Sequence, residues 1–342
     1  MVDNLFVVES PLQALIALEL SIRFKDEKNG VIYRFVEGRE RNNQQIEKVL
    51  NKGYWNFRKE ILFDHSSGFA NHKSIVRELN LFKKKFPKGV SQLFIGEFRS
   101  QWMHFMRVAV LPVRTILIDD GAATLTVKRE FIDRGIYFPE ALWKEGGVIK
   151  KCAKRLMYRR FIQKQLLQSP LYLASAFIKS ESLYPIDFSA LKENFKNCVK
   201  NNTKRCVFFF GSKYSESGIV AREYELNFLA QVKEFYSSYE CDLVYCSHRD
   251  ESDEKLSVIK DVLGFDVLSS DSPAEIFLLE NSHSIVEVSG AYSSVLNNAK
   301  ILFPEIEIRA FQLASSKISL KYRENIELLY EHFNKDGINV VS

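Results

Sequence analysis

The sequence has 342 residues, of which 46% are hydrophobic and 27% are charged, and its formal net charge is +5. This composition is typical of a folded protein with apolar cores and excludes a disordered or fibrous chain. The charge is too small for a dedicated nucleic-acid binder, although it suits an anionic substrate or surface. The length predicts two domains of ordinary size.

The first stretch, MVDNLFVVESPLQAL, carries no basic region, and Glu9 and Pro11 interrupt its apolar run, so we expect no signal peptide. No stretch approaches the roughly 20 apolar residues of a spanning helix. The five cysteines form no CxxC pair, and their odd number argues against a complete disulfide framework. We therefore expect a cytoplasmic protein that can meet a membrane only by lying on its inner face.

In chain order, the first half alternates short apolar runs with amphipathic segments. Strands are predicted at residues 4–8, 30–36, 60–64, 91–96 and 114–119, and helices at 11–24, 42–51, 72–86 and 99–109. Such alternation is typical of βαβ units around a parallel sheet.

The alternation stops at a basic helical segment near residues 147–168 and at a stretch with prolines and serines, 169–189, which we interpret as the crossing between two lobes. It resumes with predicted strands at 204–211, 241–246, 265–270, 283–288 and 299–304, and with predicted helices at 221–237, 252–262, 273–280, 292–299 and 319–333.

The predicted fold class is therefore α/β, with two Rossmann-like domains whose parallel sheets face a central cleft. We expect one domain at residues 1–168, a second at 190–316, and a carboxyl-terminal helix within 317–342. Open sheets of this kind bind ligands at the carboxyl ends of their strands, so functional residues are expected directly after strands.

Asp119 and Asp120 end the last predicted strand of the first domain, and Gly121 after them permits a tight turn. Adjacent strand residues point to opposite faces, so the two carboxylates do not easily share a metal ion. The pattern is typical either of a single ionised base or of an ordinary Asp-Asp-Gly turn. Since no other ligand stands at a convincing spacing, we predict no metal site.

His248 and Arg249 follow the predicted strand at 241–246. A histidine there can exchange a proton near neutral pH, and the arginine offers a cationic fork for a phosphate or carboxylate. The alternative is a solvated loop histidine with no catalytic role.

Gly290, Ser293 and Ser294 lie between a predicted strand and the start of a predicted helix. Hydroxyls and unpaired backbone N–H groups at such a helix terminus bind phosphate, and an ordinary serine N-cap explains the same pattern. Glu275, near the start of the preceding helix, either complements the helix dipole or accepts hydrogen bonds from a ribose.

Gly211 and Ser212 end the first strand of the second domain. The stretch lacks the GxGxxG and P-loop patterns, which argues against the common dinucleotide and NTP sites. These two residues are candidates for phosphate binding by position alone.

The segment 147–168 combines basic and apolar residues at near-helical spacing. Ile149, Ala153, Leu156 and Phe161 predict an apolar stripe beside a basic face. Such a helix can rest on an anionic leaflet, and the alternative is a solvated face packed on its own domain. The seven basic residues between Lys150 and Lys164, with no acid among them, are Lys150, Lys151, Lys154, Arg155, Arg159, Arg160 and Lys164.

Taken in order, five short motifs resemble the bacterial sialyltransferases, in particular relatives of the lipooligosaccharide sialyltransferases and capsular polysialyltransferases. The motifs are ESPLQAL after the first strand, DDG at the end of the first domain's last strand, YCSHR in the second domain, and then PAE and YSS. The resemblance covers most of the chain and implies the two-Rossmann architecture called GT-B.

In that family the acidic-acidic-Gly motif supplies the base, the His-Pro motif contacts the leaving nucleotide, and a Ser-Ser or Ser-Thr pair holds its phosphate. By this resemblance Asp119 is expected to be the base, with Asp120 as the alternative, and His248 to contact the phosphate. Arg249 departs from the family pattern, because it stands where the proline usually is, and this leaves the sugar open. The residues implied in binding the CMP part of the donor are Gly211, Ser212, Arg249, Glu275, Gly290, Ser293 and Ser294.

The resemblance implies an inverting, metal-independent transferase that moves sialic acid from CMP-sialic acid to a hydroxyl of a surface glycan, without a cofactor. A first alternative is a donor with another CMP-linked acid, such as legionaminic acid, pseudaminic acid or Kdo. A second is a non-catalytic protein that keeps a nucleotide-binding fold and holds an anionic polymer. Nucleic-acid binding is disfavoured, since the aromatic residues are not interleaved with the basic cluster.

Overall fold

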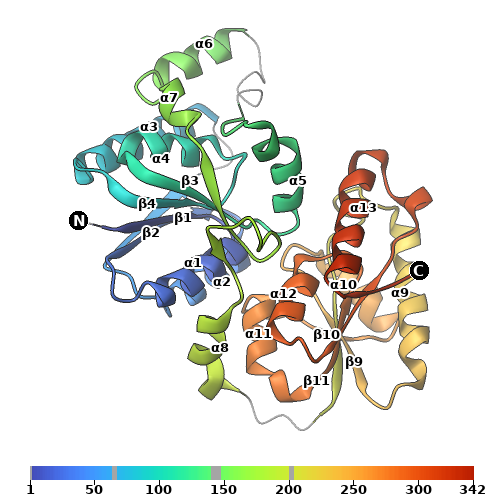
Figure 1. The fold of residues 1–342 in the computed structure, drawn as a ribbon. Helices are drawn as coiled ribbons and strands as arrows, with labels where there is room; N and C mark the ends of the chain where they lie inside the picture. Colours follow the sequence, from blue (N-terminus) through green and yellow to red (C-terminus); the bar gives the residue numbers. More distant parts are fainter. Residues whose placement is uncertain (1, 64–67, 140–147, 200–203) are drawn as a thin grey trace. The chain divides into compact units, whose positions relative to one another are not determined.

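The computed structural model describes residues 2–63, 68–139, 148–199 and 204–342. The chain forms two compact units, Met1–Ile186 and Asp187–Ser342. Each unit is built around one sheet flanked by helices (Figure 1). The first sheet has seven strands in the order β3-β2-β1-β4-β5-β6-β7, and the second has six in the order β10-β9-β8-β11-β12-β13.

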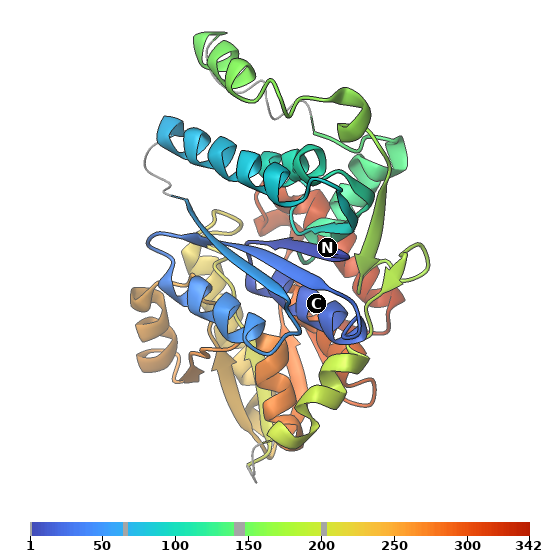
Figure 2. The ribbon, with the colours of Figure 1, turned by 90° about the vertical axis from the view of Figure 1, so that its left-hand side faces the viewer.

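The first sheet is parallel in all its described pairings, and β1, an inner strand, is completely buried. Burial on both faces is typical of a parallel sheet covered by helices. Helices α1 and α2 pack together, as do α3 and α4, and Figure 2 shows the two pairs on opposite sides of the strands. The strands are β1 Asn4–Val8, β2 Asn29–Val36, β3 Phe57–Phe63, β4 Val90–Ile95, β5 Pro112–Ile118, β6 Leu171–Ser175 and β7 Tyr184–Pro185. The helices are α1 Pro11–Arg23, α2 Glu40–Leu50, α3 Gly68–Lys85, α4 Gln101–Val110, α5 Ala123–Glu130, α6 Val148–Met157 and α7 Lys164–Leu167.

The second sheet is also parallel in all its described pairings, and its central strand β8 is buried throughout. Its strands are β8 Cys206–Phe210, β9 Asp242–Cys246, β10 Asp266–Leu268, β11 Ile285–Gly290, β12 Glu307–Phe311 and β13 Asn339–Val341. Its helices are α8 Ser189–Phe195, α9 Arg222–Phe235, α10 Asp253–Asp261, α11 Ala274–Glu280, α12 Ser294–Leu302 and α13 Leu320–Lys335.

Both sheets reverse their strand order once, between β1 and β4 in the first unit and between β8 and β11 in the second. Open α/β sheets bind ligands at this reversal, at the carboxyl ends of the strands. In the second sheet Phe210 pairs with both Cys246 and Gly290, so β8, β9 and β11 end at the same level. The loops that follow these three strands are therefore neighbours.

The chain passes from the first unit to the second within the predicted crossing, 169–189, but most of this stretch forms β6 and β7 of the first sheet. Leu171, Leu173 and Ala174 are buried, and β6 pairs with β5. Pro185 lies in the edge strand β7, where a missing N–H is tolerated. The first unit thus extends to Ile186 and not to residue 168.

The strand predicted at 299–304 is also wrong. Helix α12 continues to Leu302, because Leu296, Ala299 and Leu302 recur every three residues and are all buried on one helix face. The strand that follows is β12, and it begins at Glu307.

The end of the chain belongs to the second sheet. After α13, β13 pairs with β12 and forms the last strand of the sheet. The segment 317–342, predicted as a separate helix, therefore contributes both a helix and an edge strand to the second unit.

The basic segment forms a shorter helix than expected, and the predicted stripe of four apolar residues is wrong. Helix α6 ends at Met157, so Phe161 lies beyond it, where it is 1% exposed. Tyr158 is buried and stacks on Phe105 of α4. Leu156, in contrast, is 66% exposed. The side chains at positions 149–151, predicted to belong to the stripe and the basic face, lie outside the described residues.

None of the helices in the described part of the chain combines the length and the apolarity that crossing a bilayer requires.

Candidate functional site

Asp119 is a buried link between two strands of the first sheet. Its carboxylate is 1% exposed, accepts a hydrogen bond from the Ser175 hydroxyl at 2.6 Å and another from the Ala176 backbone N–H at 2.6 Å. Burial raises the pKa of Asp119 to about 6, and the hydrogen bonds from Ser175 and Ala176 oppose that rise. These contacts join the end of β5 to the end of β6.

Asp120 points to a different part of the same unit. Its Oδ1 atom accepts a hydrogen bond from Nε2 of Gln13 on α1 at 2.8 Å, and its side chain is only partly buried. Gly121 has a φ of +69°, so the turn after the pair needs a residue without a Cβ. As the strand geometry predicts, the two adjacent carboxylates have different partners.

Glu97, directly after β4, is the neighbour of Asp120 that the sequence interpretation missed. Burial raises the pKa of Glu97 to about 8, and the charge of Asp120 and a hydrogen bond with its carboxyl add to the rise. Glu97 is therefore protonated at neutral pH, and its O–H group donates a hydrogen bond to the Asp120 carboxyl group. The sequence could have indicated Glu97 as a candidate, because it is an acid immediately after the predicted strand at 91–96.

Gln13 reaches Asp120 by crossing the end of β4. A Cβ at Gly96 would lie 2.1 Å from the Gln13 Oε1 atom, so the glycine makes room for the amide. The same Oε1 atom accepts the backbone N–H of Glu9 at 2.8 Å. Glu9 in turn pairs with Arg34 at 3.0 Å. Hydrogen bonds through Gln13 thus connect the end of β1, where the motif ESPLQAL begins, to the Asp120 carboxylate.

In the second unit, His248 is held in one tautomer. The backbone N–H of Asp250 donates to Nδ1 of His248 at 3.2 Å, so Nδ1 accepts and the ring proton is on Nε2. Burial lowers the pKa of His248 to about 4, and the charge of Arg249 lowers it further. At neutral pH the imidazole is uncharged and offers Nε2–H as a donor.

Cationic groups surround this histidine. Lys213, in the loop after β8, pairs with Asp250 at 3.3 Å. The charges of Arg249, Lys213 and Lys255 all act to lower the pKa of His248, and Asp250 acts in the opposite direction. A bound anion would reduce the repulsion among these cations.

Ser293 and Ser294 begin α12. Ser293 is the N-cap residue, and its Oγ atom accepts the Val295 backbone N–H at 3.3 Å. This is the ordinary capping arrangement that the sequence left open, and it leaves the hydroxyl hydrogen able to donate to another group. Glu275 is 4% exposed and accepts a hydrogen bond from the Asn298 amide of α12 at 2.7 Å, while burial raises its pKa.

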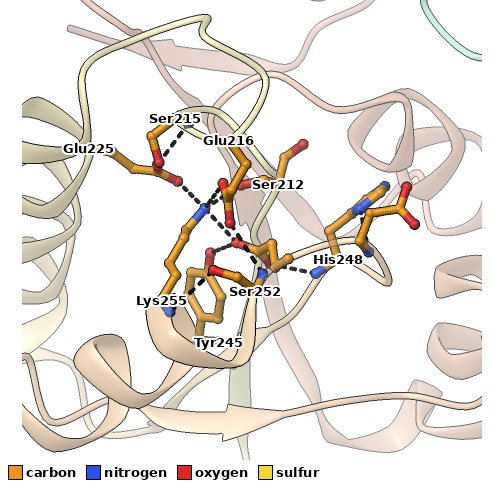
Figure 3. Close-up of polar contacts among 10 residues, drawn as sticks. Ser212, Ser215, Glu216, Glu225, Tyr245, His248, Ser252 and Lys255 are labelled. Carbon is orange, nitrogen blue, oxygen red and sulfur yellow. Dashed lines mark hydrogen bonds and ion pairs between the residues drawn. The ribbon is translucent and has the colours of Figure 1, made fainter.

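Close packing requires glycine at the two glycine positions of the predicted donor site. A Cβ at Gly211 would lie 2.1 Å from the Tyr245 hydroxyl, and one at Gly290 would lie 3.0 Å from the Phe210 carbonyl oxygen. Ser212 contributes its backbone carbonyl, which accepts a hydrogen bond from Lys255 at 2.7 Å. Figure 3 shows Lys255, at the start of α10, pointing to Ser212 in the loop after β8.

The predicted residues thus fall into two groups. Gly211 and Ser212 follow β8, His248 and Arg249 follow β9, and Gly290, Ser293 and Ser294 end β11 or follow it, so all lie at the carboxyl ends of three neighbouring strands. Asp119 and Asp120 belong to the first unit. In residues 2–63, 68–139, 148–199 and 204–342, no three His, Cys, Asp or Glu side chains gather in a way that could hold a metal ion. The absence of a metal from the reaction stays a prediction.

Solved structures share the fold of this chain. An alpha/beta-galactoside alpha-2,3-sialyltransferase from Photobacterium phosphoreum is 12% identical, with a TM-score of 0.54 over 99% of this chain and 98% of that one. A sialyltransferase from Photobacterium damsela is 10% identical, with a TM-score of 0.52 over 100% and 82%. A protein assigned as a UDP-N-acetylglucosamine 2-epimerase from Listeria monocytogenes is 12% identical, with a TM-score of 0.53 over 98% and 86%. These identities establish the fold alone, which is GT-B, as predicted.

The family evidence comes from the sequence. No curated protein matches the chain. The family model of the alpha-2,8-polysialyltransferases (POLYST), however, matches residues 4–312, which span both units. This match confirms the resemblance to bacterial sialyltransferases and makes the chain a glycosyltransferase by family. The chain belongs to the alpha-2,8-polysialyltransferase family.

Proposed function

We propose that this protein transfers sialic acid, or a related nonulosonic acid, from a CMP-activated donor to a hydroxyl of a cell-surface glycan, with inversion at the anomeric carbon. The observation that carries the proposal is His248, a neutral imidazole whose ring proton is on Nε2 and on which the charges of Arg249, Lys213 and Lys255 act. Family membership supplies the class of reaction.

In this proposal the second unit binds the CMP part of the donor. As the bond between the sugar and CMP breaks, negative charge grows on the phosphate, and donors already in place stabilise it. His248 donates through Nε2–H, Arg249 supplies charge, and Ser293 and Ser294 add hydroxyl and backbone donors at the start of α12. A phosphate beside His248 would also raise the pKa of the imidazole, so that the ring could take up a second proton from solvent and, as imidazolium, pass one proton to the departing CMP.

Glu275 is proposed to accept hydrogen bonds from the ribose hydroxyls. Its Oε1 atom already accepts from Asn298, and the carboxylate has a second oxygen for a ligand. Burial raises the pKa of Glu275, and the hydrogen bond from Asn298 and the charge of Arg249 oppose that rise.

The first unit is proposed to supply the base, and its geometry favours Asp120 over Asp119. Asp119 is buried and both of its oxygens accept short hydrogen bonds, so it is poorly accessible to an acceptor hydroxyl. Asp120 is only partly buried, so its carboxylate can meet the acceptor hydroxyl. The protonated Glu97 beside it would hold the Asp120 carboxyl group in place by a hydrogen bond.

The proposal includes no metal and no cofactor, because cationic side chains and Nε2–H can meet the phosphate charge by themselves. The test is transfer from CMP-sialic acid to a glycan acceptor by purified protein in the presence of a chelator. Loss of transfer in Asp120→Ala and in His248→Ala, with both proteins folded, supports the assignment. Full transfer by both variants contradicts it.

Two alternatives stay open. Legionaminic acid, pseudaminic acid or Kdo can replace sialic acid in the donor, and comparing transfer from each CMP-linked sugar distinguishes them. A non-catalytic protein that binds an anionic polymer would bind polymer without transfer, and its affinity for CMP would not depend on Ser293 and Ser294.

We also propose peripheral attachment to an anionic membrane surface through α6 and the turn after it. Leu156 is 66% exposed, and the basic side chains of Arg155, Arg159 and Arg160 are exposed close to it in the chain. The buried Tyr158 and Phe161 fix this segment to the first unit. An exposed leucine among exposed arginines matches the apolar and charged layers of a leaflet surface.

A further inference from the structure

A buried lysine joins the loops that carry two of the predicted donor-binding residues. Lys255, in the first turn of α10, has a side chain that is 2% exposed, and its ammonium group pairs with Glu216, Glu225 and Glu251. The same group donates to the Ser212 carbonyl oxygen at 2.7 Å. Figure 3 shows Ser212 and Glu216 of the loop after β8 and Glu225 of α9 converging on Lys255.

Glu251 connects this lysine to His248. Its Oε1 atom lies 2.8 Å from Nζ of Lys255 and accepts the Tyr245 hydroxyl at 2.7 Å. Its Oε2 atom accepts the backbone N–H of His248 at 2.6 Å. Lys255 and Tyr245 therefore fix the orientation of the Glu251 carboxylate through Oε1. Its Oε2 atom holds the backbone N–H of His248.

Tyr245 reaches Glu251 only because glycine is the first residue after the neighbouring strand β8. A Cβ at Gly211 would lie 2.1 Å from the tyrosine hydroxyl. Tyr245 itself is completely buried and stacks on Phe209 of β8. Gly211, which the sequence suggested as part of a phosphate loop, thus serves the site by admitting the tyrosine.

Stability alone is a weak reason for this arrangement. One ammonium group faces three carboxylates, and Glu225 and the side chain of Glu251 are almost completely buried. Removing several charges from water is costly, and apolar side chains of similar volume would fill the space at lower cost. The charged groups instead fix the positions of backbone segments, because each carboxylate also accepts a backbone N–H. The donors are Ser215 to Glu225, Ser252 to Glu216 and His248 to Glu251.

We infer that Glu251, held by Lys255 and Tyr245, is a positioning residue that sets the orientation of His248 toward the donor phosphate. The inference deepens the proposed function and rests on it for the identity of the ligand. Because Glu251 holds the backbone of His248 and Asp250 holds its Nδ1 atom, the ring has one tautomer and one direction before any ligand arrives. Such preorganisation strengthens phosphate binding, because the entropy cost of ordering the loop does not have to be met when the ligand binds.

The test compares Glu251→Ala with Glu251→Gln. Glutamine retains an oxygen for the His248 N–H and replaces only the oxygen that Lys255 and Tyr245 contact, whereas alanine removes both oxygens. We expect Glu251→Ala to weaken CMP binding at least tenfold by calorimetry and Glu251→Gln to stay within about threefold of wild type. In ¹⁵N spectra of the imidazole at neutral pH, we expect the Nε2–H tautomer in wild type and Glu251→Gln, and averaged tautomers in Glu251→Ala.

A folded Glu251→Ala protein with wild-type CMP affinity and a single Nε2–H tautomer would overturn the inference. If wild-type protein does not bind CMP, the proposed function fails, and the imidazole spectra still decide the positioning role without a ligand. Lys255→Met tests the lysine, with Lys233→Met as control, because Lys233 also donates to backbone carbonyls of the second unit but at Leu263 and Gly264. We expect loss of CMP affinity and of melting temperature in Lys255→Met alone; where that variant does not fold, the Glu251 pair decides.

Discussion

Asp119 and Asp120 are adjacent in the chain, yet their carboxylates join different elements of the first unit. Asp119 accepts the Ser175 hydroxyl at the end of β6, and Asp120 accepts the Gln13 amide of α1. Asp119 is therefore bonded within the sheet, whereas Asp120 lies partly exposed after the end of β5. This difference predicts that substitutions at the two positions will have different consequences.

Asp120→Ala is expected to reduce transfer by about 10²–10⁴-fold, the usual contribution of a positioned general base. Its CMP affinity is expected to be unchanged, because the CMP site is assigned to the second unit. Asp119→Ala is expected to lower the free energy of unfolding by about 1–3 kcal/mol for each buried donor left without a partner, here Ser175 and Ala176. Urea denaturation and a transfer assay measure the two effects, and the reverse pattern would make Asp119 the base.

Glu97→Gln is expected to flatten the pH dependence of stability. The pKa of Glu97 is raised to about 8 from an ordinary value of 4.5, so between these values the folded state binds more protons than the unfolded state. The free energy of unfolding contributed by this group is present at low pH and is lost as pH rises through 8, with a slope of up to about 1.4 kcal/mol per pH unit.

Thermal melts of wild type and Glu97→Gln from mildly acidic to mildly alkaline pH isolate this group by difference. Glutamine keeps the hydrogen bond to Asp120, so transfer at neutral pH should persist. Parallel stability curves for the two proteins would show that Glu97 is already ionised.

His248→Ala is expected to weaken CMP binding by about 10- to 100-fold, since hydrogen bonds to charged groups contribute about 1.5–3 kcal/mol. His248→Gln, which retains a donor, should recover part of this loss. Phosphate should raise the pKa of the imidazole from its low value of about 4, so wild-type CMP affinity should increase as pH falls, and that of His248→Gln should not. Calorimetry at several pH values measures this, and equal pH profiles would exclude His248 from the phosphate site.

Ser293→Ala removes the N-cap of α12 and is expected to lower stability by about 0.5–2 kcal/mol. The double variant Ser293→Ala, Ser294→Ala should also weaken CMP binding. Ser252→Ala is the matched control, because Ser252 caps α10 with the same kind of hydrogen bond. If both caps lower stability equally and neither alters CMP affinity, the serine pair has only a structural role.

The double variant Arg159→Ala, Arg160→Ala is expected to reduce binding to anionic vesicles, because each basic residue near such a surface contributes about 1 kcal/mol. Lys83→Ala, Lys84→Ala at the exposed end of α3 removes the same charge elsewhere on the first unit and serves as control. Flotation with vesicles of anionic and of neutral lipid measures the effect. Binding that ignores lipid charge, or an equal loss in the control, would contradict attachment through α6.

The amino-acid sequence by itself determined the α/β class, most helix and strand positions, and the order of the site motifs. Local patterns suffice for these features, because buried parallel strands read as apolar runs and surface helices as amphipathic ones. The family match over residues 4–312 confirms the resemblance that rested on five short motifs. The same local rules failed at 299–304, where an apolar run at the end of α12 looked like a strand.

Only the tertiary structure decided which residues of the motifs are accessible and what holds them. Asp119 is buried because Ser175, far along the chain, closes over it, and Glu97 acquires its high pKa only beside Asp120. Glu216, Glu225 and Glu251 meet at Lys255 although they come from separate loops and helices. Hydrogen bonding and burial depend on distance in space, and a parallel sheet brings together strand ends that are separated in sequence by entire helices.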